Sequence, residues 1–492
     1  FYKSKTSSFG LLFNGLYGRN PFNSPGSTTV SSNGSIDSTL QTSNNNYYKN
    51  ARNALNLNYT FEDSTGHRLE ANADYTGFQN SNRMSLNTLY LNPLNEPYAS
   101  TDERQFLQTN IRLYTLKADY SRPIKQWKAA MEAGWKSTWV ETMNDLAAAI
   151  ATANSMKPDT ARSNNFQYRE TIQAAYINIK RTQHAIEWQL GLRAEYSALK
   201  GISTDLRGNK ISQPDTTYLR LFPSAFLSYR LSKKMTLSAA YSQRINRPDY
   251  QALNPFETIT DLYSSQKGNP SLRPAFSQNA EIKLLYKYAT GVTIGYNHTR
   301  NFSQSVNRQI GPATQSMLEN IGSLDNWFIN VSSPVQFSKD WQAYFSVTGF
   351  INHYRGVLPQ GRLNNKVTGL NYYLQQTIKI SGTWTGQLSS WFNSGTTEGI
   401  YKSKWLGSLD LGVKKTIWKQ KGSVGLGWID IANTQRWKQT VNFGEQDYVQ
   451  YRKWESRGLR LQFSWKFGKT TYSEKERTGN TDANRIREKS SN

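Results

Sequence analysis

The segment 244–274 holds the residues of this chain that are best suited to bind a ligand. Its sequence is RINRPDYQALNPFETITDLYSSQKGNPSLRP. Arginine guanidinium groups pair with carboxylates and phosphates through two parallel hydrogen bonds, so this segment could grip an anionic ligand. Its aromatic rings could stack on a flat or sugar-like ligand. The candidate binding residues are Arg244, Asn246, Arg247, Tyr250, Asn254, Phe256 and Tyr263.

The same segment has a structural alternative. Its prolines, Pro248, Pro255, Pro270 and Pro274, fix the backbone angle φ, and Gly268-Asn269 supplies a turn. Such a segment could fold a loop back over the rim of a larger fold without touching a ligand. We favour this structural interpretation over direct ligand contact.

No residue pattern of an enzyme accompanies the segment. There is no nucleophile elbow, phosphate-binding loop or metal-ligand spacing, and the chain has no Cys and four His. The carboxylates that could be mistaken for catalytic pairs, Glu132, Glu187, Glu195 and Glu281, each have a Lys or Arg nearby on the same strand face (Lys128, Lys136, Arg193, Lys283). Ion pairs explain them, so we predict no catalytic residue, metal site or cofactor.

Composition excludes two further classes. The 492 residues include 13% aromatics, which is too many for a disordered chain, and no apolar run approaches the roughly 18 residues of a transmembrane helix. The longest such run, 146–153, lies in a stretch (145–154) that we predict as a short helix because Asp145 could cap an Ala-rich segment. The net charge of +24 is spread over the chain, which argues against nucleic-acid binding.

The dominant pattern is a strict alternation of apolar and polar residues. In the last predicted strand, Leu459, Leu461, Phe463, Trp465 and Phe467 alternate with Arg460, Gln462, Ser464 and Lys466. Similar alternation recurs at 127–139, 186–196, 280–288 and 341–352. These strands have about 10 to 14 residues, whereas globular strands have about 5 or 6 and a bilayer-crossing strand needs about 9 to 11. The pattern therefore predicts strands with lipid on one face and water on the other.

Connections of two kinds separate the predicted strands. Short turns such as 122–125, 232–234 and 338–340 alternate with long polar stretches at 19–50, 80–107, 141–165, 199–217, 245–276, 302–323 and 353–366. Several aromatic residues lie beside the short turns, among them Tyr120, Trp127, Tyr288, Trp341, Trp384 and Trp418. Short turns on one side, long loops on the other and an aromatic girdle are typical of a bacterial outer-membrane β-barrel. We predict an all-β fold, a large antiparallel transmembrane barrel with about 18 strands in this chain.

The segment 244–274 also carries a family resemblance. It is similar to the outer-membrane β-barrel family of TonB-dependent receptors of the Bacteroidetes type. The matching residues are Arg244, Asn246, Arg247, Pro248, Tyr250, Leu253, Asn254, Pro255, Phe256, Gly268, Asn269, Pro270, Leu272 and Pro274, together with Trp454-Glu455-Ser456-Arg457 and the strand that ends at Phe467-Gly468. The resemblance is good over about 220–467.

The resemblance implies more than the residues themselves show. Such receptors have about 22 strands and a plug inside the barrel, so we expect this chain to form part of such a barrel without the plug. They import a scarce solute with the help of the TonB complex and, in some cases, a surface lipoprotein. The net charge would suit phosphate-rich outer-membrane lipid or lipopolysaccharide at the rim, and a lumen that favours anions or an acidic plug. We expect the barrel to occupy 1–467 and a polar, disordered periplasmic tail to occupy 468–492.

Two alternatives remain open at this point. One is a passive or structural outer-membrane barrel. The other is a soluble all-β protein that binds or cleaves glycans, with the apolar strand faces packed against each other. The sequence does not name the solute.

Overall fold

The computed structural model describes residues 2–3, 6–152, 155–212, 215–311, 313–444, 446–468 and 485. Apart from a short 3-10 turn, η1 (Lys125–Trp127), the elements are strands. In chain order they are β1 (Tyr2–Lys3), β2 (Ser7–Ser32), β3 (Ser35–Glu62), β4 (Arg68–Leu91), β5 (Pro97–Ile124), β6 (Ala129–Thr152), β7 (Ser155–Pro158), β8 (Asn164–Gln183), β9 (Ile186–Asp205), β10 (Lys210–Ser212), β11 (Asp215–Ser232), β12 (Met235–Asn246), β13 (Glu257–Asp261) and β14 (Ser264–Lys267). The second half contains β15 (Ala275–Tyr286), β16 (Thr290–Ile310), β17 (Ala313–Gln336), β18 (Trp341–Leu358), β19 (Gly361–Lys379), β20 (Trp384–Asn393), β21 (Thr396–Glu398), β22 (Tyr401–Ser403), β23 (Leu406–Ile417), β24 (Gly422–Ile429), β25 (Arg436–Phe443), β26 (Gln446–Lys453) and β27 (Gly458–Trp465).

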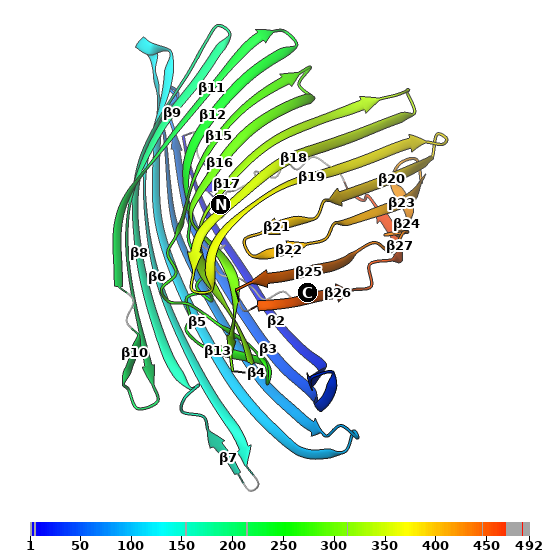
Figure 1. Cartoon of the computed structure of the whole chain (residues 1–492). Coiled ribbons are helices and arrows are strands. Elements are labelled where there is room, and N and C mark those ends of the chain that lie inside the picture. The colour runs from blue at the N-terminus through cyan, green and yellow to red at the C-terminus, as the bar shows by residue number, and fades with distance from the viewer. Residues whose placement is uncertain are drawn as a thin grey trace.

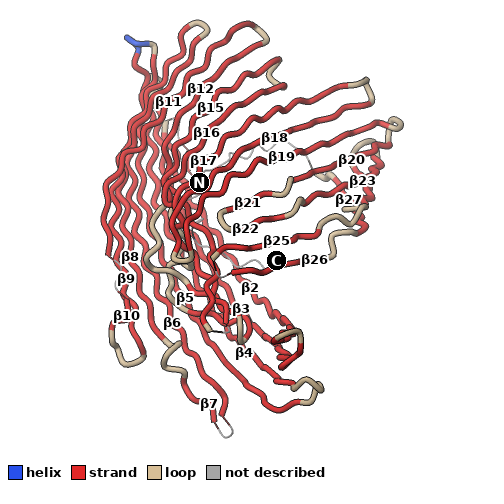
Figure 2. Tube along the Cα trace, in the orientation of Figure 1, coloured by secondary structure: helices blue, strands red, loops and turns tan. Residues whose placement is uncertain are grey.

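Eighteen of these strands form one curved wall around a central lumen (Figure 1). Each pairs antiparallel with the next in the order β2, β3, β4, β5, β6, β8, β9, β11, β12, β15, β16, β17, β18, β19, β20, β23, β24 and β27. Figure 2 shows that loops are confined to the two ends of this wall and to the lumen. The predicted all-β barrel architecture and its strand number are confirmed.

The apolar face of the wall points outward. In β27, Leu459, Leu461, Phe463 and Trp465 have 59% to 76% of their surface exposed. The apolar residues predicted on β9 are exposed in the same way, including Ile186, Leu190, Leu192 and Tyr196. A soluble protein would bury these side chains against a second layer, so the soluble alternative is wrong. Exposed apolar bands need a lipid environment.

The long polar stretches are strands rather than loops over most of their length. The stretch 19–50 is a hairpin of β2 and β3 that turns at Asn33-Gly34, and 80–107 continues β4 and β5. Their polar side chains do not mark irregular backbone, because cross-strand hydrogen bonds satisfy it well beyond the 9 to 11 residues or so that a bilayer requires. Among the described residues, 245–276 is the one predicted loop that is irregular over most of its length.

The predicted helix at 145–154 is wrong. β6 continues through Asp145 to Thr152. It pairs with β5 as far as Ile150 on one edge, and with β8 as far as Leu146 and β7 from Ala149 on the other. Strand pairing on both edges outweighs the helix propensity of alanine. Residues 153–154 lie outside the described part of the chain. Among the described helices, none has the length and hydropathy of a membrane span.

The two edges of the wall are β2 and β27. Over the described residues, the outer edge of β2 pairs with the two residues of β1 alone, and β27 pairs with β24 alone. The wall of the described residues is therefore open at one seam, which we call the β2/β27 seam. Gly468 and Arg485 are the described residues of the predicted tail, so the division into 1–467 and 468–492 stays a prediction.

Two apolar clusters fill parts of the lumen. The larger joins the wall strands β4, β5, β6 and β8 to the segment that follows β12. The smaller cluster connects four wall strands, β16 through β19, with a separate four-stranded sheet of β21, β22, β25 and β26. This sheet covers those wall strands from inside the lumen. The Tyr401 hydroxyl fixes this second sheet by donating to the Ser305 carbonyl at 2.7 Å.

Candidate functional site

Residues 247–274, between β12 and β15, cross the lumen. On one side, the Asn44 side chain of β3 donates to the Thr260 carbonyl at 2.9 Å, and that of Gln105 of β5 donates to the Glu257 carbonyl at 3.2 Å. On the other side, β14 pairs in parallel with β17. β3 and β17 are far apart in the strand order of the wall, so the segment spans the interior (Figure 1). We call residues 247–274 the crossing loop.

Arg247 attaches the beginning of the crossing loop to the wall. Its guanidinium contacts the carboxylate of Glu195 on β9, lies 3.5 Å from that of Glu170 on β8, and donates to the Ser197 hydroxyl at 2.9 Å. The Arg247 side chain is 9% exposed and the two carboxylates at most 1%. Buried charges require such pairing, so this cluster fixes where the loop leaves the wall.

Tyr250 lies beside this ion cluster. It is 2% exposed, and its ring centroid is 6.2 Å from that of Tyr168 on β8. The guanidinium of Arg485 lies 4.2 Å from the Tyr250 ring centroid and 2.6 Å from a Glu170 oxygen. Glu170 and the two tyrosines therefore form a pocket that accepts a guanidinium group.

Apolar packing holds the middle of the loop. Leu253, Phe256 and Leu272 are buried against wall residues that face the lumen, namely Phe78, Ile111, Leu113, Val140 and Phe166. Gly268 allows the loop to fold on itself, because a Cβ atom there would lie 1.7 Å from the Asn254 carbonyl oxygen. The inner wall is thus apolar where the loop covers it, although an uncovered lumen wall would be polar throughout.

A cavity of about 610 Å³ remains between the crossing loop and the inner wall of β3 to β5. Amide, hydroxyl and cationic groups line much of it. They come from Tyr48, Asn80, Asn82 and Thr109 on the wall and from Asn246, Gln251, Asn254, Gln266, Lys267 and Arg273 at or within the loop. The cavity can hydrogen-bond a polar solute. Its charged lining residues are Arg247, which is paired with wall carboxylates, together with Asp249, Lys267 and Arg273, so the remaining charge at the cavity is positive.

The structure brings most of the predicted site residues together. Asn246, Arg247, Asn254 and Phe256 border the cavity. Tyr250 is buried behind it in the guanidinium pocket, while Arg244 is exposed on β12, away from this cavity. Tyr263 lies at the far end of the loop, where its carbonyl accepts the Thr314 amide at 2.7 Å. Direct contact of these residues with a solute stays a prediction.

Sequence reasoning missed Glu170, the partner of both Arg247 and Arg485. Its signal was present, because Glu170 is the one charged residue in an inward row of Phe166, Tyr168, Ile172 and Ala174. The predicted ion pairs are found for Glu195 with Arg193 and, with a different partner, for Glu187, which lies 2.7 Å from Lys180. Glu132 instead accepts a hydrogen bond from Tyr176 at 2.9 Å.

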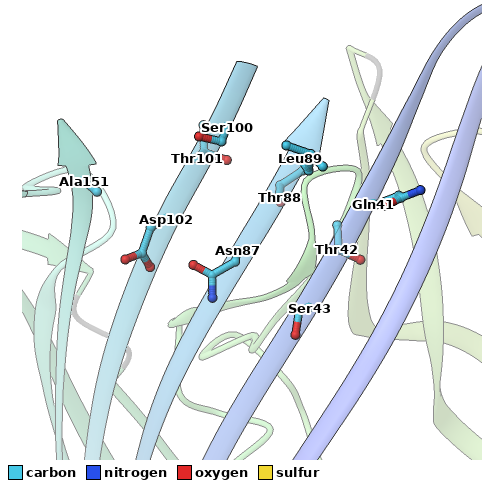
Figure 3. A pocket seen from close by; sticks show the side chains of 10 residues that line it. All are labelled: Gln41, Thr42, Ser43, Asn87, Thr88, Leu89, Ser100, Thr101, Asp102 and Ala151. Carbon is cyan, nitrogen blue, oxygen red and sulfur yellow. The ribbon is translucent and has the colours of Figure 1, made fainter. Parts of the chain in front are cut away.

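A polar hollow of about 620 Å³ lies nearer the long-hairpin end of the wall (Figure 3). Its side chains come from β3, β4, β5 and β6, and Thr42, Thr88 and Thr101 stand directly opposite one another across three strands. Ser43, Asn87 and Asp102 stand in register with one another and lie on the same strand faces as the exposed apolar residues Leu55 and Tyr114, so most of this hollow lies on the outer face of the wall. Short turns mark the periplasmic end of such barrels, which places the hollow on the extracellular side of the membrane. Within the described residues, no three His, Cys, Asp or Glu side chains group to hold a metal ion.

The segment Trp454-Glu455-Ser456-Arg457, which also carries the family resemblance, contacts Asp430 through Ser456. Asp430 lies in the turn between β24 and β25, where its carboxylate accepts the Thr434 amide at 2.9 Å and the Ser456 hydroxyl. Burial alone would raise the pKa of Asp430, but these hydrogen bonds together outweigh it and lower the pKa. Ser456 therefore ties the segment before β27 to the neighbouring turn.

The sequence and the geometry can now be compared with known proteins. The model of a family described as "Outer membrane protein beta-barrel family" matches residues 59–465. The chain belongs to this family. The barrel is thus a bacterial outer-membrane protein, as the apolar exterior of its wall requires. Among curated proteins, none matches its sequence.

Solved structures share the fold of the barrel. The FrpB iron transporter from Neisseria meningitidis (F5-1 variant) superposes with a TM-score of 0.50 at 11% identity, over 94% of this chain and 83% of the transporter. The ferric yersiniabactin uptake receptor FyuA from Yersinia pestis superposes with a TM-score of 0.50 at 11% identity, over 95% of this chain and 81% of the receptor. At this identity the similarity concerns the fold.

Proposed function

We propose that this chain is the barrel of a TonB-dependent outer-membrane receptor that imports a solute. The crossing loop carries the proposal, because it spans the lumen and borders a polar cavity against the inner wall. A passive pore has no need for a buried arginine and an apolar cluster that hold such a loop in place. The barrel breaks no covalent bond in this scheme; it binds, orients and passes the solute.

The candidate residues divide into two roles under this proposal. Arg247 and Tyr250 position the loop, because both are committed to buried contacts with the wall. Asn246, Asn254 and Phe256 face the cavity and contact the solute there. Arg244, on β12 before the loop, and Tyr263, in the turn between β13 and β14, contact the solute outside the cavity.

The cavity favours an anionic or polyhydroxylated solute. Lys267 and Arg273 supply positive charge, and Asn80, Asn82 and Gln266 supply amide donors and acceptors. Phe256 adds one aromatic edge. An iron complex such as the ferric yersiniabactin taken up by FyuA fits this description, and so do oligosaccharides.

The proposal includes partners that complete the barrel. Backbone groups in hydrocarbon must be paired, so the β2/β27 seam requires further strands before the wall can lie in a bilayer. A plug domain would fill the lumen, the TonB complex would supply energy, and a surface lipoprotein could cover the extracellular end.

The test compares uptake in cells with and without the gene. Each strain receives a panel of 55Fe-loaded siderophores and tritiated oligosaccharides, before and after an uncoupler collapses the proton-motive force. We expect uptake of one solute to require both the gene and the energised membrane. Uptake that needs the gene but survives the uncoupler would support the passive barrel instead.

A matched pair of variants connects that uptake to the cavity. Lys267→Gln removes a cation that lines the cavity, and Lys414→Gln removes one from the distant strand β23. We expect the first variant to raise the solute concentration for half-maximal uptake and the second to leave it unchanged. Equal effects of the two variants would argue against solute binding at the cavity.

A further inference from the structure

The outer face of β16 to β19 changes from apolar to basic within a short distance. Residues that stand directly opposite one another on neighbouring strands form a row. One row contains Tyr296, Trp327 and Ile351, and the next contains His298, Asp325, His353 and Lys366. Arg300 and Arg355 follow two residues further along their strands. Side chains two residues apart on a strand are separated by about 7 Å, so the change falls at a single level of the wall.

That level is the boundary between the hydrocarbon and the headgroups. The rows on the periplasmic side of Tyr296 and Trp327 are apolar, with Ile294 and Ile329 directly opposite each other and both about half exposed. Aromatic rings mark the interface of transmembrane barrels. The basic row therefore lies at the depth of the outer-leaflet headgroups.

An apolar groove of about 610 Å³ leads up to this boundary. Its floor contains the small residues Ala225, Ala239 and Ala280 on three neighbouring strands. Its walls include Trp188 and, at its upper end, Tyr296 and Trp327, whose ring centroids are 4.4 Å apart. Small side chains between large rings leave a depression that a chain of methylene groups can fill.

A second hollow of about 330 Å³ begins where the groove ends. Tyr296 and Trp327 border both, and Asp325, His353, Arg355 and Lys366 complete the second. The two hollows thus form one path from the hydrocarbon to the basic row. It is apolar at one end and cationic at the other.

Asp325 organises the cationic end. It accepts hydrogen bonds from the Tyr296 hydroxyl and His298, each at 2.7 Å, and it contacts the Arg355 guanidinium. The Asp325 side chain is 12% exposed, whereas that of Arg355 is 52% exposed. The carboxylate thereby fixes an arginine whose guanidinium remains open to the membrane surface. Arg355 and Lys366 border this hollow together with Asp325, and Arg300 stands across Ser323 from Arg355.

We propose that this path is a binding site for a phosphorylated lipid of the outer leaflet. One acyl chain lies in the groove over Ala225, Ala239 and Ala280. A phosphate lies between Arg355, Lys366 and Arg300. Charge complementarity and depth select this occupant, because guanidinium and ammonium groups bind phosphate strongly and the groove opens directly into the hydrocarbon. The site does not depend on the solute or on energised uptake.

The test measures binding of lipid A to the detergent-purified protein by native mass spectrometry. The variant R355Q/K366Q removes two cations from the site, and the control K414Q/R460Q removes two from the lumen side of β23 and β27. We expect R355Q/K366Q to weaken lipid A binding by about thirtyfold and the control to weaken it less than threefold. Circular dichroism confirms that both variants retain their strand content.

Three further measurements test whether the site binds the phosphate group and the acyl chain of one lipid. Dephosphorylated lipid A should bind as weakly to the wild type as lipid A does to R355Q/K366Q. Ala239→Trp fills the groove and should weaken lipid A binding while leaving any binding of inorganic phosphate unchanged. Equal binding of lipid A by the wild type, R355Q/K366Q and Ala239→Trp would overturn the proposal. Strong binding of the dephosphorylated lipid would also overturn the proposal. The same holds if a protein that excludes lipid A occupies the site at Arg355 and Lys366.

Discussion

Replacing Arg247 by methionine removes the cation that attaches the crossing loop while keeping most of the side-chain volume. The loss of one partner of a buried ion pair costs about 3 to 5 kcal/mol. Here Glu195 keeps its contact with Arg193 and Glu170 keeps Arg485, so the lower end of that range applies. About 3 kcal/mol corresponds to roughly a hundredfold increase in the fraction of molecules with a detached loop.

The absence of cysteine allows this fraction to be measured directly. Ile259 belongs to the loop itself and is 7% exposed where it packs against Met84 and Leu86 of β4, so a single Ile259→Cys should react with a maleimide when the loop detaches. We expect Arg247→Met to accelerate that reaction about a hundredfold, at about 1.4 kcal/mol per tenfold. Arg244→Met removes the same charge from an exposed position on β12 and serves as the control. A rate for Arg247→Met within threefold of that control would refute the anchoring role of the ion cluster.

Three other predictions concern the crossing loop, the turn at Asp430 and the lipid-facing side of the wall. Gly268→Ala should destabilise the attached state of the loop by about 1 to 3 kcal/mol, because the new methyl group meets the Asn254 carbonyl. The maleimide reaction of Ile259→Cys should accelerate accordingly, and an unchanged rate would contradict the close approach. Asp430→Asn should flatten the acid limb of a thermal-unfolding series, because a lowered folded pKa stabilises the protein above about pH 4 and that stability is lost as the pH falls further; a variant that loses stability with acid as steeply as the wild type would refute this. Leu461→Arg should destabilise the vesicle-inserted protein by about 2 to 4 kcal/mol in urea, whereas Gln462→Arg on the lumen face should cost little; equal costs would place lipid on the wrong face.

The alternation of apolar and polar residues was sufficient to predict the wall. In β27 each outward residue was identified from the sequence, because a strand surrounded by lipid and water has no other way to satisfy both solvents. The number of wall strands followed from the spacing of the turns. Pattern failed where the environment was the same on both faces: above the membrane, β2 and β3 are polar on both sides and resemble loops in sequence.

The site was predictable in its residues but not in its arrangement. The segment 244–274 was identified from its arginines, prolines and aromatics. Its inward course depends on contacts across about 50 to more than 150 residues of sequence, such as Arg247 with Glu195 and Gln105 with Glu257. Period-two patterning carries no information on which inward residue meets which loop. The same limit applies to the Ala-rich stretch 145–154, for which the sequence predicts a helix: its described residues form a strand through pairing with β5, β7 and the end of β8.

The β2/β27 seam of the described residues also governs how isolated copies of the chain would behave outside a bilayer. An unpaired edge is a template for another strand, and β2 presents Leu11, Leu12 and Phe13 with at least half of each side chain exposed. Addition of β27 from one molecule to β2 of the next is a head-to-tail contact, which repeats without closing unless the rotation happens to complete a ring. Refolded copies of this chain should therefore form open-ended oligomers, whose length grows with concentration.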